Sequence, residues 1–424
     1  MIPRLPAGFA IVIAASLMAC QTPTQPQPPT FAAGVEAASR ADLGAAIEIW
    51  TPLAETGDMR AQYRLARLYA EGEGVEKDPA EAARLYRLAG EQGHVEAQFE
   101  LAEYYAEGVG VPQDFAAAAD WYRRAGNQGH IKAQTRLGAH YEKGLGVEQS
   151  YAEASIWWRK AAAQGDVGAQ TTLGALYQRG LGVPQDYVQA AAWWRQAAEQ
   201  GDAKAQTNLG YLFSQGLGVA QDDAQAAAWW TEAANQGVPT AQSNLGVLYE
   251  KGLGVRQDYG EAVRWWELAA AQDQPDAQHN LAYMYANGRG VPKNDTEAIR
   301  YWRLAAGQGL AVAQYYLGNM YARGRGVPQS YIEAAKWYLL AAEQGYPDSQ
   351  LALGKVYQGG GGGLAVDLVQ AHKWYNLAAA RFQPGKARSE AAGYRDALAR
   401  GMSAWQLNEA QRLALEWQPH TQGP

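Results

Sequence analysis

The chain has a single cysteine among its 424 residues, and it is poor in charge. One thiol makes a disulfide framework within the chain impossible. Only 19 % of the residues are charged, and the formal net charge is −7. This mild acidity argues against a nucleic-acid partner, because such partners require a basic face. The hydrophobic share of 48 % is nevertheless large enough to bury a core, in several domains or in one long array.

Motifs for catalysis and metal binding are also missing from the sequence. The six histidines include no His-Glu-x-x-His pair and no other metal-ligand spacing. No Gly-x-Ser-x-Gly segment is present, and no second cysteine exists. We therefore assign no catalytic residue and no metal ligand, expect no cofactor, and predict a protein that is not an enzyme.

The cysteine, Cys20, directly follows a short apolar segment. Residues 8–18 are too few to span a bilayer comfortably, so residues 1–19 are predicted to be a signal peptide. The segment LMAC at 17–20 resembles the bacterial lipobox. That resemblance implies cleavage before Cys20 and lipidation of its thiol and new amine. Gln21 follows instead of Asp, which favours the outer membrane over the inner one.

A stretch rich in Gln, Thr and Pro comes next, at residues 20–30. Such a composition cannot pack a core and favours extended polyproline conformations. We expect a tether that holds a folded body off the membrane, on the periplasmic side of a bacterial cell envelope. Two alternatives stay open, namely an ordinary signal peptide with an incidental cysteine and an uncleaved anchor.

The rest of the chain is dominated by an internal repeat of 36 residues. A Gly-x-Gly segment recurs with its first glycine at 72, 108, 144, 180, 216, 252, 288 and 324. An Ala-Gln pair and a leucine recur with the same step, beginning at 61 and 65. Recurrence at one period is the signature of a repeat architecture.

Each repeat contains two helical patterns, as residues 166–200 illustrate. Apolar residues follow the i, i+4, i+7 spacing of one helical face in both halves. In the first half they are Ala169, Leu173, Leu176 and Tyr177, and in the second half Tyr187, Ala191, Trp194 and Ala198. Asp186 is placed to cap the second helix, and Gly201 to end it. His94 and His130 fall in the turn where other repeats have Asp166 and Asp202, and we expect them to be surface residues.

The Gly-x-Gly segments are not phosphate-binding loops on this interpretation. A dinucleotide or phosphate loop follows a strand and opens a helix, whereas Gly180 and Gly182 lie between two predicted helices. We predict that these glycines end the first helix and turn the chain back. Their recurrence supports this, because a single catalytic site does not need eight copies.

Paired aromatics recur in the second helix, for example Trp193-Trp194. Neighbours in a helix point about 100° apart, so both rings cannot line one groove and at least one must be core. A glycine within the first helix, such as Gly174, lowers helix stability relative to alanine. This cost is understandable if a bulky ring must approach the helix backbone at that position. We predict that the aromatics pack between helices, with sugar stacking as the open alternative.

The segment AQTTLGALYQRGLGVPQDYVQAAAWWRQAAEQGDA, at 169–203, resembles the Sel-1-like repeat, a relative of the tetratricopeptide repeat. The resemblance implies an all-α, right-handed superhelical solenoid of antiparallel helix pairs. We expect a degenerate half-repeat at 31–57, nine repeats at 58–384 and capping helices at 385–418. The Ser403 to Gln406 segment resembles a helix cap.

The resemblance also implies that the first helix of each repeat lines a concave groove. The charged first repeats are followed by a row of Asn and Tyr that could hold an extended peptide, because an amide both donates and accepts hydrogen bonds. The predicted partner-binding residues are Asn208, Tyr211, Asn244, Asn280, Tyr283, Tyr316 and Asn319. The expected function is a protein-binding scaffold in the cell envelope. The alternatives are a component that binds or exports polysaccharide or peptidoglycan and, with less support, a host-directed surface factor.

Overall fold

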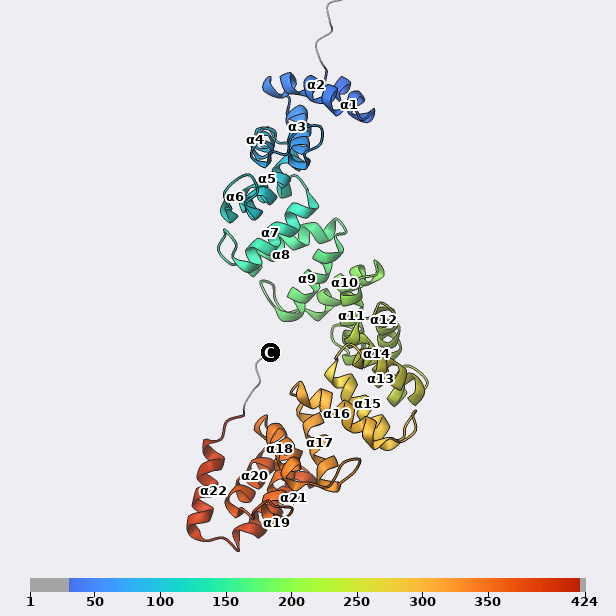
Figure 1. Ribbon diagram of the computed structural model, residues 1–424, viewed down its shortest axis with the longest axis vertical. Helices are drawn as coiled ribbons and strands as arrows, with labels where there is room; N and C mark the ends of the chain where they lie inside the picture. Colours follow the sequence, from blue (N-terminus) through green and yellow to red (C-terminus); the bar gives the residue numbers. More distant parts are fainter. Residues whose placement is uncertain (1–29, 420–424) are drawn as a thin grey trace, which may run out of the picture. The chain divides into compact units, whose positions relative to one another are not determined.

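The computed structural model describes residues 30–419, which form 22 helices and no β-strand (Figure 1). Cys20 and the predicted signal peptide lie outside the described residues. Within each compact unit, consecutive helices of the repeats pack against each other. The prediction of an all-α array of helix pairs is confirmed.

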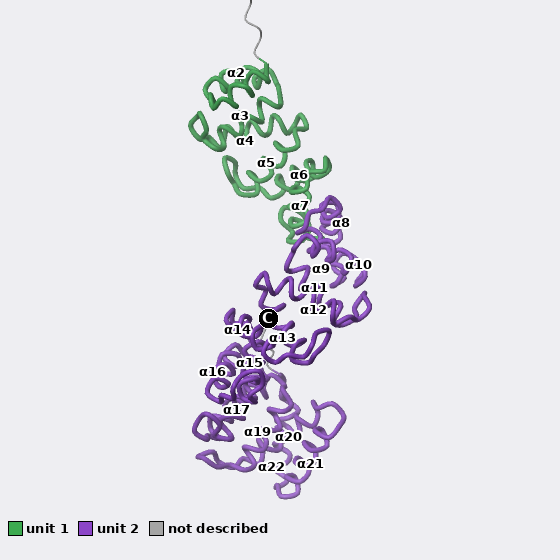
Figure 2. The backbone as a smooth tube through the Cα atoms, turned by 90° about the vertical axis from the view of Figure 1, so that its right-hand side faces the viewer, with its two compact units in different colours: residues 1–150 green, residues 151–424 purple. Residues whose placement is uncertain are grey.

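The chain divides into two units, residues 1–150 and residues 151–424 (Figure 2). The first unit contains α1 Phe31–Ser39, α2 Leu43–Glu55, α3 Met59–Glu71, α4 Pro79–Glu91, α5 Val95–Glu107, α6 Phe115–Asn127 and α7 Ile131–Lys143. The second unit begins with α8 Tyr151–Ala163, α9 Val167–Arg179, α10 Tyr187–Glu199, α11 Ala203–Gln215, α12 Asp223–Asn235, α13 Pro239–Lys251, α14 Tyr259–Ala270 and α15 Pro275–Asn287. It continues with α16 Asp295–Gly307, α17 Ala311–Arg323, α18 Tyr331–Glu343, α19 Pro347–Gly359, α20 Leu368–Arg381, α21 Lys386–Ala399 and α22 Ala404–Glu416.

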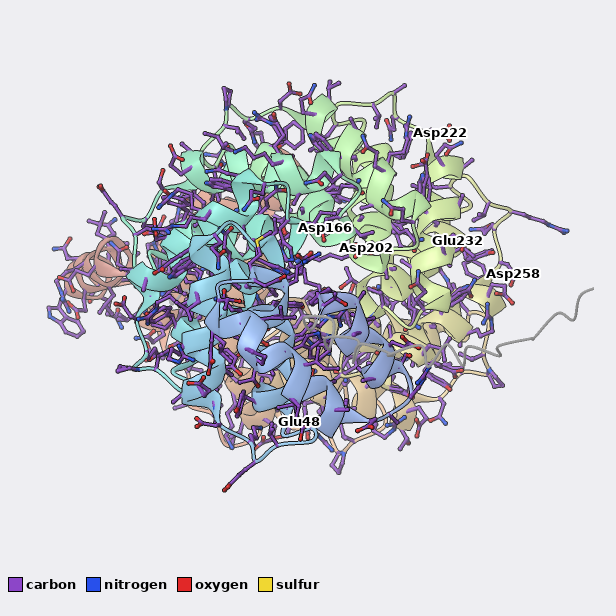
Figure 3. All side chains as sticks on the ribbon, turned by 90° about the horizontal axis from the view of Figure 1, so that it is seen from above. Glu48, Asp166, Asp202, Asp222, Glu232 and Asp258 are labelled. Carbon is purple, nitrogen blue, oxygen red and sulfur yellow. The ribbon has the colours of Figure 1, made fainter. Side chains whose placement is uncertain are left out.

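Helix starts are fixed by side chains that accept hydrogen bonds from free backbone N–H groups. Asp186 accepts from the N–H groups of Val188 and Gln189 at 2.8 and 3.0 Å, as predicted. Four other capping aspartates are labelled in Figure 3, namely Asp166, Asp202, Asp222 and Asp258.

The expectation for His94 and His130 was wrong, because neither is simply a surface residue. Each accepts a backbone N–H of its helix through Nδ1, at 3.3 Å for His94 and 3.1 Å for His130. Each ring also stacks on an aromatic of the preceding repeat, His94 on Tyr63 and His130 on Phe99. They replace aspartate as caps, and burial lowers the pKa of both imidazoles.

The two glycines of each Gly-x-Gly segment serve different purposes. Gly180 has φ +67° and ends α9 in the left-handed conformation that glycine adopts without strain. Gly182 has φ +69°, and a Cβ atom there would lie 2.1 Å from the carbonyl carbon of Tyr151. The second glycine therefore lets the loop touch the backbone at the start of α8, so the structural interpretation of these loops is confirmed.

The core is built around one aromatic of each pair, here called the inner aromatic. In the second unit Trp194, Trp230, Trp266 and Trp302 are each at most 5 % exposed. The indole Nε1–H of Trp194 donates to the backbone oxygen of Thr171 at 3.0 Å, so its polar atom is satisfied. The neighbouring Trp193 is half-buried, which confirms that the two rings of a pair face different surroundings.

Buried glutamines connect successive helices, and they explain why Ala-Gln recurs. Gln170, 3 % exposed, donates to the backbone oxygen of Ala162 at the end of the preceding helix, at 3.1 Å. Its own Oε1 accepts from Gln200, which directly follows α10, at 2.8 Å. The same arrangement recurs with Gln206 and Gln236, and with Gln242 and Gln272.

Two turns differ in sequence from the repeat, and other interactions shape the backbone there. Asp273 stands where other repeats have glycine, and it adopts the left-handed conformation at φ +58°. The glycine-rich loop before α20 closes on itself through two hydrogen bonds between Gly361 and Leu364. At the C-terminal end, Ser403 and Gln406 form a reciprocal capping box that begins α22.

Candidate binding surface on the first helices of the repeats

The candidate surface is the exposed side of α11, α13, α15 and α17, the first helices of four consecutive repeats in the second unit. We call it the helix-A face. Leu209 and Leu245, in α11 and α13, are fully buried, so these helices are anchored by their opposite sides. All seven predicted partner-binding residues are on these four helices. Tyr211 is 44 % exposed, and the other six are half-buried.

Three asparagines occupy equivalent positions in successive repeats. Asn208, Asn244 and Asn280 each precede a buried leucine of their helix by one residue. Within residues 30–419, none of their side-chain amides has a hydrogen-bond partner. Because each amide carries two donors and one acceptor, the three side chains are available to a ligand.

A first hollow of about 480 Å³ lies between α11 and α13. Tyr211 and Asn244 line it together, so the structure brings these two predicted residues into one site. Trp230, Val247 and Leu248 supply apolar surface. Polar side chains complete the lining, namely Ser214, Gln215, Gln221, Asp223 and Lys251. The hollow combines apolar contact area with donors and acceptors, which suits a peptide more than a purely apolar ligand.

A second hollow of about 240 Å³ lies between α15 and α17, and Tyr283, Tyr316 and Asn319 all line it. The Tyr316 ring stacks on Trp302 with 5.3 Å between centroids and contacts Tyr283 edge to face. Burial raises the pKa of the Tyr316 hydroxyl, so the ring carries no charge at neutral pH.

Two of the polar side chains that line this second hollow already have partners within the protein. The Asn319 Oδ1 accepts a hydrogen bond from the Tyr338 hydroxyl at 2.8 Å, which leaves its NH₂ group for a ligand. Arg325 is paired with Asp295 at 2.5 Å, whereas Arg323 has no ion-pair partner in the described part of the chain. The second hollow is therefore aromatic and lined by a positive charge, Arg323, that is unpaired within residues 30–419, whereas the first hollow is lined by both Asp223 and Lys251.

Asn208 and Asn280 line neither hollow, although they share helices with residues that do. Cys20, the predicted lipidation site, lies outside the described residues. The glutamine pairs were not predicted, although the recurrence of Ala-Gln and Gln-Gly every 36 residues was a signal for them. The hydrogen bond from the Trp302 Nε1–H to His279 Nδ1, at 3.1 Å, was not predicted either. The only signal for it in the sequence was the position of His279 within the repeat.

Two findings concern other kinds of site. Among residues 30–419, no group of three or more His, Cys, Asp or Glu side chains could hold a metal ion. No helix in that same range has the length and apolar character needed to cross a membrane.

The helix pairs, the recurring Gly-x-Gly turns and the glutamine connections define a helical-repeat protein of the kind that serves as a protein–protein interaction scaffold. The Sel1 repeat family model matches nine consecutive segments of this chain from residue 60 to residue 381. The chain therefore belongs to the Sel1 repeat family, whose members are generally non-catalytic scaffolds.

Two solved structures are similar to this chain over most of its length. One is c5321, a protective antigen present in uropathogenic Escherichia coli strains that displays an SLR fold. It is 32 % identical, with 92 % of each chain covered and a TM-score of 0.64. The other is a Sel1 repeat protein from Oxalobacter formigenes, also 32 % identical, with 78 % of this chain and 93 % of that chain covered and a TM-score of 0.61. No curated protein sequence matched the chain.

Proposed function

We propose that the protein is a non-catalytic scaffold that holds an extended peptide segment of a partner protein on its helix-A face. The observation that carries the proposal is the set of amides at Asn208, Asn244 and Asn280, which have no hydrogen-bond partner among the residues that the structure describes. A peptide backbone has alternating donors and acceptors, and an asparagine amide can pair with both. Such contacts hold a main chain without requiring one particular sequence.

The two hollows add side-chain contacts to this main-chain recognition. The first, around Tyr211 and Asn244, accepts an apolar side chain beside polar groups. The second, around Tyr283 and Tyr316, has Arg323 in its lining and suits an acidic or amide side chain. Partial exposure of Tyr rings favours binding, because a tyrosine supplies large contact area at a low cost in conformational entropy.

We also propose that the chain is a lipoprotein of a bacterial cell envelope, anchored at Cys20 and most simply in the outer membrane. This part rests on the LMAC segment at 17–20 and on Gln21. The E. coli relative is described as a protective antigen, and an envelope location of this chain would agree with that description.

A triple substitution of Asn208, Asn244 and Asn280 by alanine tests the scaffold proposal. Each lost hydrogen bond is worth about 0.5–1.5 kcal/mol, so binding should weaken by roughly 1.5–4.5 kcal/mol in total. The matched control replaces three exposed residues of second helices, Gln189, Gln225 and Glu232, by alanine. Circular dichroism checks folding, and quantitative capture of cross-linked envelope proteins measures binding.

The scaffold proposal fails if the asparagine triple variant folds and keeps its partners while the control variant loses them. The polysaccharide alternative predicts a different pattern. Capsular or peptidoglycan fragments would bind the wild type, and Tyr283→Ala together with Tyr316→Ala would remove that binding more strongly than the asparagine changes. Peptide and glycan binding are thus separated by which variant loses which ligand.

A further inference from the structure

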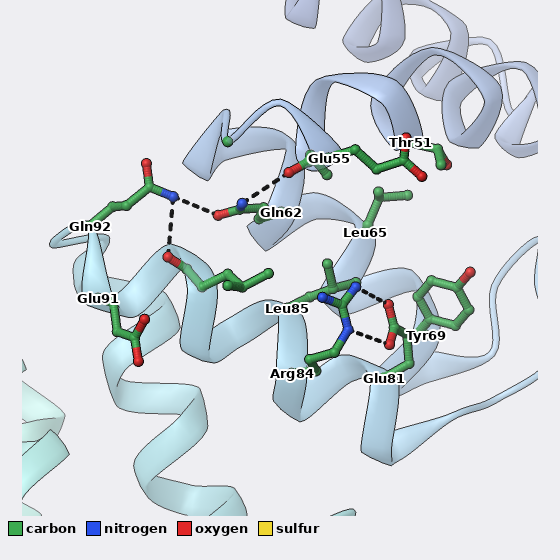
Figure 4. Close-up of a pocket in the computed structure, with 13 residues that line it drawn as sticks. Thr51, Glu55, Gln62, Leu65, Tyr69, Glu81, Arg84, Leu85, Glu91 and Gln92 are labelled. Carbon is green, nitrogen blue, oxygen red and sulfur yellow. Dashed lines mark hydrogen bonds and ion pairs between the residues drawn. The ribbon is translucent and has the colours of Figure 1, made fainter.

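The first repeat contains a pocket of about 770 Å³ between α2 and α4, beside α3. Gln62 and Leu85 are among its lining residues (Figure 4). Ala54 and Leu88 line it as well. Gln62 and Gln92 are hydrogen-bonded on one side of it, and Arg84 is paired with Glu81 on the other. We call it the first-repeat pocket. It lies wholly in the first unit and does not depend on the helix-A face.

Leu85 is an exception to the repeat. The equivalent position in each of the other eight repeats is aromatic, and we call it the outer aromatic. Those residues are Trp121, Trp157, Trp193, Trp229, Trp265, Tyr301, Trp337 and Trp374. Leu85 itself is only 3 % exposed and lines the pocket, and its side chain is smaller than the indole or phenol ring found at this position in the other repeats.

The next repeat shows where the missing ring would lie. A Cβ atom on Gly90 would be 3.2 Å from Cζ3 of Trp121 and 3.3 Å from Cγ of Gln98, so that indole packs between α4 and the start of α5. The residues equivalent to Gly90 and Gln98 are Ala54 and Gln62, thirty-six positions earlier. Both line the first-repeat pocket. The pocket is therefore the slot that a tryptophan of the chain itself fills in the following repeat.

The rim of the pocket is acidic. Glu55, Glu81 and Glu91 line it together with one cation, Arg84, which is paired with Glu81 at 2.6 Å. Glu55 and Glu91 are exposed, and neither has an ion-pair partner in the described residues. In the next repeat, Arg124 lies 4.3 Å from the centre of the Trp121 ring, whereas the equivalent residue here is Leu88. An aromatic ring in this pocket would thus meet the leucine side chains Leu65, Leu85 and Leu88, the Gln62–Gln92 amides, and two carboxylates that have no ion-pair partner within residues 30–419.

We propose that the first-repeat pocket binds a tryptophan side chain that a partner polypeptide presents next to lysine or arginine. The shape of the pocket favours an indole-sized ring, because Trp121 occupies the equivalent slot in the next repeat. The charge of the pocket selects a cation as the neighbouring residue, because Glu55 and Glu91 line the pocket and have no ion-pair partner in the described part of the chain. This is a second site, on the side of the second helices, with a ligand chemistry unlike that of the helix-A face.

The test uses the full chain and the capped tripeptide Lys-Trp-Lys, with binding measured by isothermal titration calorimetry. The Leu85→Trp variant restores the residue type of the other repeats and fills the slot. It should weaken tripeptide binding by about tenfold or more, because a misfit of even one methylene in a binding pocket costs about 10–200-fold. It should also raise the melting temperature, because a cavity is filled. No binding by the wild type, or equal binding by Leu85→Trp, would overturn the proposal.

A second pair of variants tests the charge and does not depend on how Leu85→Trp folds. Glu55→Gln with Glu91→Gln should weaken Lys-Trp-Lys by about two- to fivefold, as expected for exposed charge pairs, and leave Ser-Trp-Ser unchanged. The control, Glu76→Gln with Glu107→Gln, changes the same charge at exposed sites outside the pocket. If both double variants weaken the tripeptide equally, the effect is one of net charge and the proposed recognition is refuted.

Discussion

A Cβ atom on Gly174 would lie 2.5 Å from Cδ1 and Nε1 of the Trp194 indole. The ring thus rests directly on the backbone of α9, and there is no room for even a methyl group between them. The same relationship holds between Gly210 and Trp230 and between Gly246 and Trp266. A residue that weakens the isolated helix is therefore required by the packing of the helix pair.

Replacing Gly174 by alanine should consequently destabilise the protein, although alanine is the better helix former. Overpacking of a core costs about 1–3 kcal/mol, and most of this range exceeds the propensity gain of about 1 kcal/mol. The matched control is Gly168→Ala in the same helix, where only the Asp166 Oδ1 lies near, at 3.5 Å. That change should stabilise by about 0.5–1 kcal/mol. Urea unfolding measures both, and a similar gain in the two variants would contradict the packing account.

The glutamine connection between helices should be sensitive to Gln170→Ala. This change removes the bond to the Ala162 oxygen and leaves the Gln200 amide without its Gln170 partner. The Ala162 oxygen still accepts from the Gly165 N–H, and the exposed Gln200 amide still donates to the Gln196 oxygen. The expected loss is therefore that of two hydrogen bonds, about 0.5–1.5 kcal/mol each. Gln189 is exposed on α10, and its change to alanine should stay within about 0.5 kcal/mol. Equal unfolding midpoints for the two variants would show that the connection contributes nothing.

The free energy of unfolding should decrease as the pH is lowered, and part of this decrease should come from His279. Burial lowers the pKa of this imidazole from 6.5 to about 4, and its Nδ1 accepts from the Trp302 indole. Between pH 6.5 and about pH 4, the imidazole of His279 is protonated in the unfolded chain but not in the folded chain. The stabilisation is therefore complete above pH 6.5 and is lost as the pH falls toward 4, by about 3 kcal/mol at most.

The His279→Ser variant isolates this effect. Serine occupies the equivalent position in the preceding repeat, where the Trp266 Nε1–H donates to the Ser243 backbone oxygen at 3.1 Å. The variant should lack the part of the pH dependence that comes from the histidine. Urea unfolding at several pH values gives the two curves, and parallel curves for variant and wild type would rule out a role for His279.

Cys20→Ala tests the proposed lipid anchor. Without the thiol no lipid can be attached to this side chain, so the protein should leave the membrane fraction and should no longer incorporate labelled fatty acid. The matched control is Thr22→Ala, two residues further along the chain, which keeps the cysteine and should stay in the membrane fraction. Retention of the fully processed Cys20→Ala protein in membranes would show that the anchor lies elsewhere.

Much of the fold could be predicted because the same apolar spacing, capping residues and turn glycines recur in every repeat or nearly so. The apolar spacing around Leu173 and Trp194 predicted the two helices of a pair, and Asp186 and Gly180 predicted where they start and end. Each of these is a local property, since a capping side chain or a left-handed glycine acts within a few residues. The conflict between Gly174 and helix propensity even indicated that a ring must lie close to it.

The candidate site was less accessible to prediction. The repeat placed Asn208, Asn244 and Asn280 at equivalent positions, but it did not show that Tyr211 shares a hollow with Asn244. Nor did it show that Asn319 already accepts a bond from Tyr338, because the distance between two side chains depends on how neighbouring helices dock. Leu85 was visible in the sequence as a departure from the repeat, yet its consequence, an open pocket, is a matter of unfilled volume.

The sequence by itself determined the all-α repeat, its period, its turns and its aromatic core, because these follow from local backbone preferences and from periodicity. The tertiary structure alone decided which polar groups are used up and which remain free. Gln170 is buried and His279 is half-buried, and both are used in hydrogen bonds between helices, whereas the Asn208 amide stayed without a partner among the described residues. Burial and pairing arise from contacts across different helices, and no single stretch of the chain encodes them.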